Sequence, residues 1–171
     1  MHPTAMQAAR EFFQKFSGEF VEPTIVEIGS QDVNGSLREV APPSKYVGLD
    51  FQKANGVDIV LEDAYRFPLP DAYADIIVTS SCFEHSEMFW VTFLEAVRIL
   101  KPRGLFYINA PSAGDYHAYP VDCWRFYPDA AGALKTWAKR NGYDITVEYT
   151  TILDGHWKDF VVVYRKNPKP R

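Results

Sequence analysis

The chain has 171 residues and a net charge of −4, and 47% of its residues are hydrophobic and 15% aromatic. This composition indicates a folded domain with a continuous core and argues against a disordered chain. The acidic balance disfavours nucleic acid as a partner, because a phosphate backbone attracts a basic surface. We expect one domain over residues 1–171 that is cytoplasmic, has no membrane partner and is a monomer or a homodimer.

Two cysteines, Cys82 and Cys123, are too few for a disulfide framework or a cysteine metal cluster. We therefore expect reduced thiols and no bound metal. Cys82 has no activating base that the sequence makes visible, so a thiol nucleophile is not predicted.

Hydrophobic periodicity in the first part of the chain predicts a helix followed by strands. Apolar residues recur at helical spacing over about residues 4–17, and Gly18 can end that helix. Asn34 or Ser36 can begin a second helix, which Pro42 and its neighbour would end. Three short β-rich runs are predicted as strands, at residues 24–28, 45–50 and 57–61.

The remaining chain continues the alternation of strands and helices. Strands are predicted at residues 75–79, 105–109, 145–151 and 159–164, and helices at 88–100 and 128–141. An irregular segment, 110–127, lies between the predicted strand 105–109 and the predicted helix 128–141. The last two strands are joined by a short connection with Asp154 and Gly155, so they should pair antiparallel. The pattern predicts an α/β fold, a doubly wound and mostly parallel seven-stranded sheet with a C-terminal antiparallel hairpin and helices on both faces.

Two of the predicted strands end in an acid, about twenty residues apart. Glu27, Gly29 and Ser30 lie at the end of the first strand, and Asp50 and Phe51 at the end of the second. In an open α/β sheet both ends face one crevice, where a carboxylate can accept both hydroxyls of a ribose. Glu27 can receive an ammonium group or brace the loop. Phe51 can lie against an adenine or belong to the core.

The residues after Gly29 argue against a bound pyrophosphate. A dinucleotide site favours the pattern G-x-G-x-x-G, whose second glycine lets a helix N-terminus approach the phosphates. Here Gln31 and Asp32 occupy that region and would crowd and repel a pyrophosphate. An adenosine-type cofactor without phosphates is therefore favoured.

Two further segments follow predicted strands at the same edge. Asp63 and Ala64 come after the third strand, where a carboxylate and a backbone N–H can contact an adenine. Ser81, Phe83 and His85 come after the fourth. Phe83 can cover a cofactor, and His85 can orient a substrate or take a proton, although a structural histidine is the more common alternative.

These segments in this order resemble a class I S-adenosylmethionine-dependent methyltransferase of the small type 11 kind, from about residue 24 to residue 166. The resemblance is carried by Val26–Ser30, Gly48–Asp50, Glu62–Ala64, Phe67–Asp71, Phe83–His85 and Arg98–Leu105. It implies a Rossmann-like fold with a cofactor half at about 24–110, a substrate-side loop at 110–127, and a helix and hairpin at 128–166. It also implies S-adenosylmethionine as cofactor and S-adenosylhomocysteine as product. The family commonly has further glycines where this chain has Gln31 and Val33, which leaves the shape of this loop open.

The resemblance implies nine residues at the cofactor. They are Glu27, Gly29, Ser30, Asp50, Phe51, Asp63, Ala64, Ser81 and Phe83.

The irregular segment is expected to cover the crevice, since long loops in compact domains are usually functional. Its segment Pro120–Pro128 is similar to one in bacterial relatives associated with glycan or cell-surface biosynthesis. Asp122 and Arg125 can form an ion pair that shapes the loop or can contact substrate. The substrate-side candidates are Tyr116, His117, Tyr119, Asp122, Trp124 and Arg125.

The predicted activity is methyl transfer to an O, N or C nucleophile of a small molecule, such as a glycan or cell-surface precursor. The protein would mainly align the reactants and exclude water. His85 or His117 would act as a base only for a hydroxyl nucleophile. Three alternatives stay open: a non-catalytic S-adenosylmethionine-binding subunit, an NAD-dependent oxidoreductase, and methylation of RNA or protein.

Overall fold

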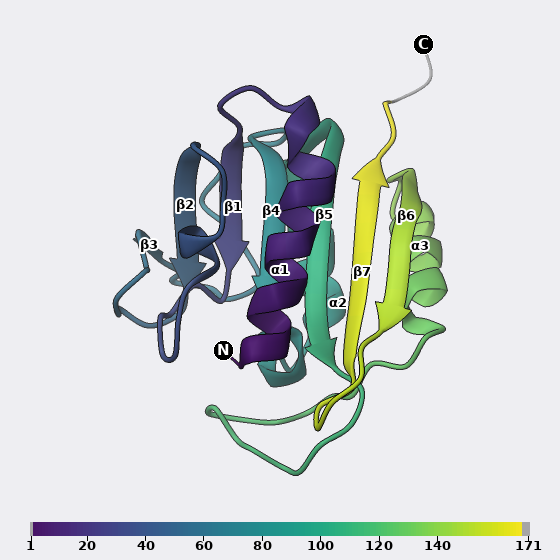
Figure 1. The fold of residues 1–171 in the computed structure, drawn as a ribbon. Helices are drawn as coiled ribbons and strands as arrows, with labels where there is room; N and C mark the ends of the chain where they lie inside the picture. The colour runs from purple at the N-terminus through teal and green to yellow at the C-terminus, as the bar shows by residue number, and fades with distance from the viewer. Residues whose placement is uncertain (1, 169–171) are drawn as a thin grey trace.

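Seven strands form one sheet in the computed structural model, which describes residues 2–168 (Figure 1). The spatial order is β3-β2-β1-β4-β5-β7-β6, in which β7 alone runs antiparallel to its two neighbours and the other paired strands are parallel. The strands are β1 Thr24–Ile28, β2 Lys45–Asp50, β3 Ile59–Val60, β4 Ala74–Ser80, β5 Leu100–Pro111, β6 Ile145–Ile152 and β7 Asp159–Lys166. This topology confirms the predicted fold class.

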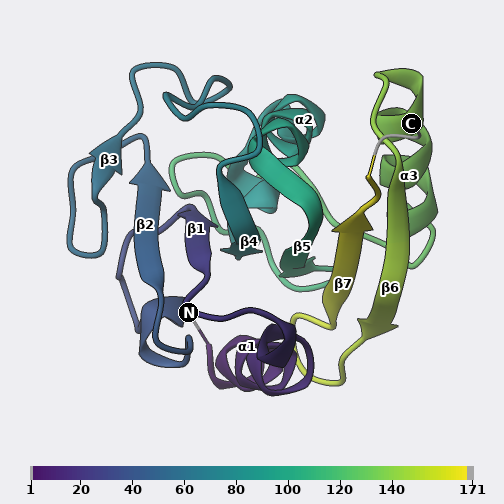
Figure 2. The same cartoon turned by 90° about the horizontal axis from the view of Figure 1, so that it is seen from above.

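Helices cover both faces of the sheet (Figure 2). Helix α1 (Pro3–Phe16) packs on one face, and α2 (Phe89–Ile99) and α3 (Ala130–Arg140) pack on the other. Three short 3-10 turns complete the elements, η1 Ser17–Glu19, η2 Leu37–Glu39 and η3 Phe83–His85. Because both faces are covered, the central strands are buried as continuous apolar runs. No helix among the described residues is long and apolar enough to cross a bilayer.

The parallel register places the carboxyl ends of three strands side by side. Ile28 at the end of β1 pairs with Leu49 of β2 on one side and with Thr79 of β4 on the other. After β1, the next two strands, β2 and β3, are added on one side of it, and the following strands, β4 and β5, are added on its other side. This reversal is the topological switch point, where open α/β sheets bind ligands.

The predicted helix beginning at Asn34 or Ser36 is wrong. The structure has only the 3-10 turn Leu37–Glu39 there, with the Ser36 hydroxyl accepting a hydrogen bond from the Arg38 backbone N–H. The two prolines that follow leave too few residues for an α-helix, whose first turn alone is costly to form. The third strand is also shorter than predicted, Ile59–Val60 in place of residues 57–61.

The fifth strand begins earlier than predicted, at Leu100 directly after α2. The sequence from Lys101 to Gly104 reads as a turn, yet it continues the strand with a register shift opposite Ala74 and Ile76. A Cβ at Gly104 would lie 2.8 Å from the carbonyl oxygen of Asp75. The bulge therefore needs a glycine. Because glycine is typical of turns, the sequence pattern predicted a turn here and a later start of the strand.

Packing of α1 on the sheet depends on Phe12. Its buried ring stacks on Tyr107 of β5, with 4.7 Å between ring centroids. We expect Phe12→Ala to lower the free energy of unfolding by about 3–5 kcal/mol, because it leaves a cavity under the helix. Urea denaturation measures this change. Arg10→Ala, at an exposed position of the same helix, should stay within about 0.5 kcal/mol of the parent chain; equal effects of the two would contradict the packing argument.

Candidate active site

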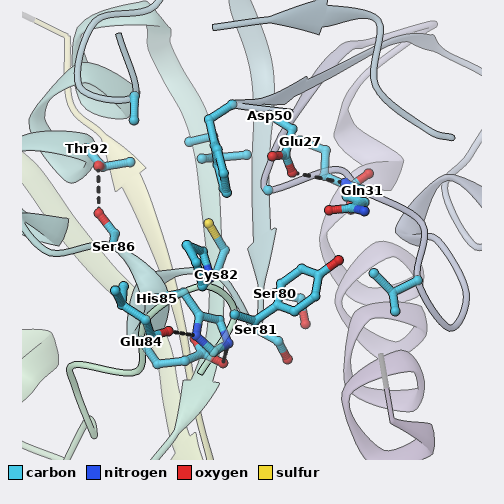
Figure 3. Close-up of a pocket in the computed structure, with 18 of the residues that line it drawn as sticks. Glu27, Gln31, Asp50, Ser80, Ser81, Cys82, Glu84, His85, Ser86 and Thr92 are labelled. Carbon is cyan, nitrogen blue, oxygen red and sulfur yellow. Dashed lines mark hydrogen bonds and ion pairs between the residues drawn. The ribbon is translucent and has the colours of Figure 1, made fainter. Parts of the chain in front are cut away.

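A cavity of about 680 Å³ lies at the carboxyl ends of β1, β2 and β4 (Figure 3). This volume is in the range of small-molecule and cofactor sites. Its walls come from the loops after these strands, from η3, from the loop after β5 and from the β6–β7 connection. The cavity thus lies at the switch point that the fold defines.

Gly29 forms the turn at the end of β1. Its φ of +76° is in the left-handed region, and a Cβ there would lie 2.6 Å from both Cβ and Sγ of Cys82. The backbone N–H groups of Gly29 and Ser30 donate to the carbonyl oxygen of Leu49 at 2.9 and 3.1 Å. A glycine is therefore required, both for the backbone conformation and for the close approach of the loops after β1 and β4.

Glu27 is a cavity-lining carboxyl that is only 3% exposed. Its Oε2 accepts a hydrogen bond from the Tyr46 hydroxyl at 2.8 Å. Burial raises the pKa of Glu27 to about 7, because water no longer stabilises the charged form. The carboxyl can therefore change charge near neutral pH, where a bound cation would favour its ionised form.

Asp50 lies opposite Glu27 at the end of β2 and also lines the cavity (Figure 3). Its Oδ2 accepts from the Gln31 backbone N–H at 3.2 Å, and its Oδ1 accepts from that of Gln52 at 3.3 Å. A carboxylate offers about four acceptor positions, so each oxygen can still receive a ligand hydroxyl.

Three other predicted cofactor residues also line the cavity, namely Phe51, Ala64 and Ser81. Phe51 is partly exposed, so its ring is accessible to a ligand. Ser81 has a φ of +51°, an uncommon conformation that turns the chain from β4 toward η3.

The structure does not bring Ser30, Asp63 and Phe83 into the lining of this cavity. The buried Ser30 side chain lies beneath Gly48, at a place where a Cβ on that glycine would be 2.6 Å from the serine Oγ. Asp63 is exposed, and its Oδ1 accepts from the Tyr65 backbone N–H at 2.8 Å. Phe83 is fully buried and its ring packs against Phe106 in the core. These three side chains therefore lie outside the cavity.

Glu84, His85 and His117 meet at the other end of the cavity. His85 Nε2 lies 3.7 Å from Glu84 Oε1, and the rings of His85 and His117 meet edge to face at 5.0 Å between centroids. Burial raises the pKa of the Glu84 carboxyl to about 8. Burial also lowers the pKa of His85.

The loop after β5 is held by an ion pair. Arg125 donates to both carboxylate oxygens of Asp122, with Nη2 at 2.8 Å from Oδ2. This pairing holds the pKa of Asp122 well below its usual range. Asp122 also accepts from the His117 backbone N–H at 2.8 Å. The pair therefore fixes the loop, and neither residue lines the cavity.

The other predicted substrate-side residues divide between the cavity and the surface. His117 and Tyr119 line the cavity. Tyr116 does not and is 77% exposed. Trp124 also lies outside the lining, and its indole N–H donates to the carbonyl oxygen of Ser86 at 2.9 Å, which attaches the loop to the segment after η3.

Sequence reasoning missed several cavity residues, among them Glu84, Ser86, Thr92 and Trp157. Glu84 could have been predicted, because it directly precedes His85 in the segment that follows the predicted fourth strand. Trp157 comes from the β6–β7 connection, and its ring lies 4.5 Å from that of His117 between centroids. Nothing in the local sequence around Trp157 indicates that contact. Cys82 lines the cavity, and burial raises the pKa of its thiol to about 12, which disfavours a thiolate nucleophile.

The sheet and the site together define the class of this protein. Strand β7 is inserted antiparallel between β5 and β6, the cavity lies at the switch point, and an acid ends β2. This is the fold of class I S-adenosylmethionine-dependent methyltransferases.

Comparison with known proteins points in the same direction. Residues 31–108, less than half of the chain, match the family model described as a methyltransferase domain of type 11. Together with the fold, this match indicates a class I S-adenosylmethionine-dependent methyltransferase, an enzyme whose cofactor is S-adenosylmethionine. No curated protein sequence matches the chain.

Solved structures are similar in fold at low sequence identity. The 1,6-didemethyltoxoflavin-N1-methyltransferase of Burkholderia thailandensis, solved with 1,6-didemethyltoxoflavin and S-adenosylhomocysteine, is 12% identical, with a TM-score of 0.70 over 96% of this chain and 79% of that one. A SAM-dependent methyltransferase from Archaeoglobus fulgidus is 15% identical, with a TM-score of 0.67 over 94% of each chain. One from Aquifex aeolicus is 16% identical, with a TM-score of 0.57 over 97% of this chain and 98% of that one.

The close approach at Gly29 gives a stability prediction. We expect Gly29→Ala to lower the free energy of unfolding by at least about 1–3 kcal/mol, since the new Cβ adds backbone strain and a clash with Cys82. Urea denaturation measures the change. Gly132→Ala is the matched control, because a Cβ there meets nothing within 4 Å. In helix α3 it should raise stability by about 0.5–1 kcal/mol. A neutral Gly29→Ala would contradict the close approach.

Proposed function

We propose that this enzyme transfers the methyl group of S-adenosylmethionine to an O, N or C nucleophile of a small-molecule acceptor. One observation carries the proposal. A single cavity is lined at one end by Glu27 and Asp50, and at the other by His85 and His117. Both reactants can therefore share one space from which the surrounding loops exclude water.

The residues at the cofactor end fit S-adenosylmethionine. Asp50 has acceptor capacity for the ribose hydroxyls, and Glu27 is a buried carboxyl suited to the ammonium group. Phe51 and Ala64 are the wall for the adenine. Gly29 leaves open the space that a Cβ would otherwise occupy. We assign Ser30, Asp63 and Phe83 a supporting role, because they lie outside the lining.

The residues at the acceptor end suit a polar ring. Tyr119 and Trp157 offer flat aromatic surfaces, while His85 and His117 offer groups that can form hydrogen bonds. A glycan or cell-surface precursor has this chemistry, and the segment around Asp122 resembles one in relatives associated with such pathways. The Burkholderia protein of the same fold holds a small heterocycle beside S-adenosylhomocysteine, which supports an acceptor of small size.

The chemistry needs little from the protein beyond alignment. When bound, S-adenosylmethionine supplies a methyl group that is already activated by the positive charge of its sulfur. Glu27 and Asp50 would hold the cofactor, and the loop at His117 would place the acceptor in line and keep water out. For a hydroxyl acceptor, the proton would leave at the end of the cavity formed by Glu84, His85 and His117.

Cofactor affinity should depend on pH through Glu27. Its pKa of about 7 means that the carboxyl becomes neutral below neutral pH and attracts an ammonium group less strongly. Its hydrogen-bond partner is Tyr46, and the charged groups that act on it are Arg38, Asp32 and Asp50. We expect the Kd for S-adenosylhomocysteine, measured by titration calorimetry, to rise about tenfold between roughly pH 8 and pH 6.

Glu27→Gln separates this effect from other titrations. The amide cannot ionise, so the variant should bind S-adenosylhomocysteine more weakly at about pH 8 and lose most of the pH dependence. If the Kd of the variant for S-adenosylhomocysteine changes with pH as much as that of the parent chain, Glu27 is not the group that contacts the ammonium.

Activity is tested with S-adenosylmethionine carrying a labelled methyl group and with pools of small hydroxylated, amine and sugar acceptors. We expect label in a small product, and we expect His117→Ala to lower turnover far more than affinity for S-adenosylhomocysteine. Equal losses in both would contradict an acceptor-side role for His117. Cofactor binding with no transfer to any pool would instead favour a non-catalytic subunit, and saturable binding of NADH alone would favour an oxidoreductase.

A further inference from the structure

The three side chains at the acceptor end have the composition of a metal site. Glu84, His85 and His117 each offer one ligand atom, and these atoms lie within 4.8 Å of one another. They come from two segments, η3 and the loop after β5. The Asp122–Arg125 ion pair holds the loop in place. The cluster lines the cavity, so an ion there would be open to a substrate.

The Nδ1 atom of each imidazole has acceptor oxygens nearby. His85 Nδ1 lies 2.6 Å from the carbonyl oxygen of Val121, and His117 Nδ1 lies 3.3 Å from Asp122 Oδ2 and 3.1 Å from the carbonyl oxygen of Asp115. These acceptors favour the tautomers with a proton on Nδ1. The Nε2 lone pair of His85, 3.7 Å from Glu84 Oε1, is then left for an ion, as in metal sites whose ligating histidines donate through the other nitrogen. The ring of His117 meets that of His85 edge to face and offers the third ligand atom.

The burial of Glu84 is a second, independent observation that favours a bound cation. The side chain is 1% exposed, and its Oε2 has no hydrogen-bond partner among the described residues. Its Oε1 lies 3.7 Å from His85 Nε2, too far for a hydrogen bond. A buried carboxyl oxygen without a hydrogen-bond partner is costly, and a cation bound at this position would offset that cost.

We propose that Glu84, His85 and His117 bind one divalent transition-metal ion, with Zn²⁺ as the reference ion. Two imidazole nitrogens and one carboxylate oxygen are the protein ligands of many catalytic zinc sites, which keep a further position open. Zinc ligands at about 2.0–2.2 Å lie roughly 3–3.5 Å from one another. The cluster must therefore contract on binding, and His117, which is on the partly exposed loop, is the side chain placed to move.

The inference rests on the proposed function and deepens it, because it selects acceptors with a hydroxyl group. A hydroxyl in the open position would coordinate the ion through oxygen, which lowers its pKa, and its proton would pass to water. An oxygen electron pair then forms the bond to the methyl carbon. The carbon–sulfur bond breaks, and its electron pair returns to sulfur, which loses its positive charge. The trio would then act by holding the ion.

Metal binding is tested without any acceptor, on protein treated with a chelator and then dialysed. Titration calorimetry with Zn²⁺ should give one site per chain, and Co²⁺ should give visible absorption bands that Zn²⁺ abolishes. Glu84→Gln and His117→Ala should each weaken Zn²⁺ binding by at least about tenfold, in line with losses on disturbing metal-site residues. Unfolding curves and S-adenosylhomocysteine affinity show that each variant is folded.

His156→Ala is the matched control, because this histidine lies outside the cluster and outside the lining of the cavity. It should bind Zn²⁺ like the parent chain. No binding by the parent chain, or equal weakening in His156→Ala, would overturn the metal site. Methyl transfer that persists in a chelator would overturn it too, and would leave the proposed function standing. Zn²⁺ binding without transfer to any acceptor would remove the proposed function and leave the metal site.

Discussion

The close approach of Gly29 to Cys82 holds together the loops that follow β1 and β4. Gly29 directly follows β1, the strand between β2 and β4, so it lies at the switch point. Cys82 directly precedes η3, the turn that carries Glu84 and His85. This close approach therefore lies between the side of the cavity with Glu27 and the side with Glu84 and His85. In the proposed function the protein contributes mainly alignment, so the packing at Gly29 would matter for catalysis as well as for folding.

Two acids of the cavity, Glu27 and Glu84, differ from Asp122 of the loop in the direction of their pKa shifts. Burial raises the pKa of Glu27 and Glu84, which face the cavity, whereas Arg125 lowers the pKa of Asp122, which does not. A carboxyl with a raised pKa is destabilised in its charged form by the folded protein and gains from a cation. Asp122 already has its cation. The raised pKa values are consistent with the proposed roles of Glu27 and Glu84 toward a cation, whereas the ion pair with Arg125 gives Asp122 a structural role.

Sequence patterns predicted the strands better than the contacts between their ends. The bounds of β1 and β2 are those predicted, because apolar runs ending in an acid are clear signals. The predicted helix near Ser36 is absent. The prediction relied on capping residues and gave too little weight to the few residues available before the prolines. His85 and His117 were each candidates, but their meeting was not visible. It depends on a loop without periodicity, whose path is set by the Asp122–Arg125 ion pair and by contacts to η3.

The two ends of the cavity are built from different kinds of structure, and in the proposed function this would separate cofactor binding from acceptor choice. Glu27 and Asp50 belong to parallel strands fixed by hydrogen bonds on both sides, so a change there disturbs the sheet. His117 and Tyr119 belong to a loop that is held by the Asp122–Arg125 ion pair, the Trp124–Ser86 hydrogen bond and backbone contacts. If this loop is the acceptor wall, as we propose, substitutions in it would alter the wall at small cost to the fold. A change of acceptor would then need changes in the loop alone, while the sheet keeps the same methyl donor.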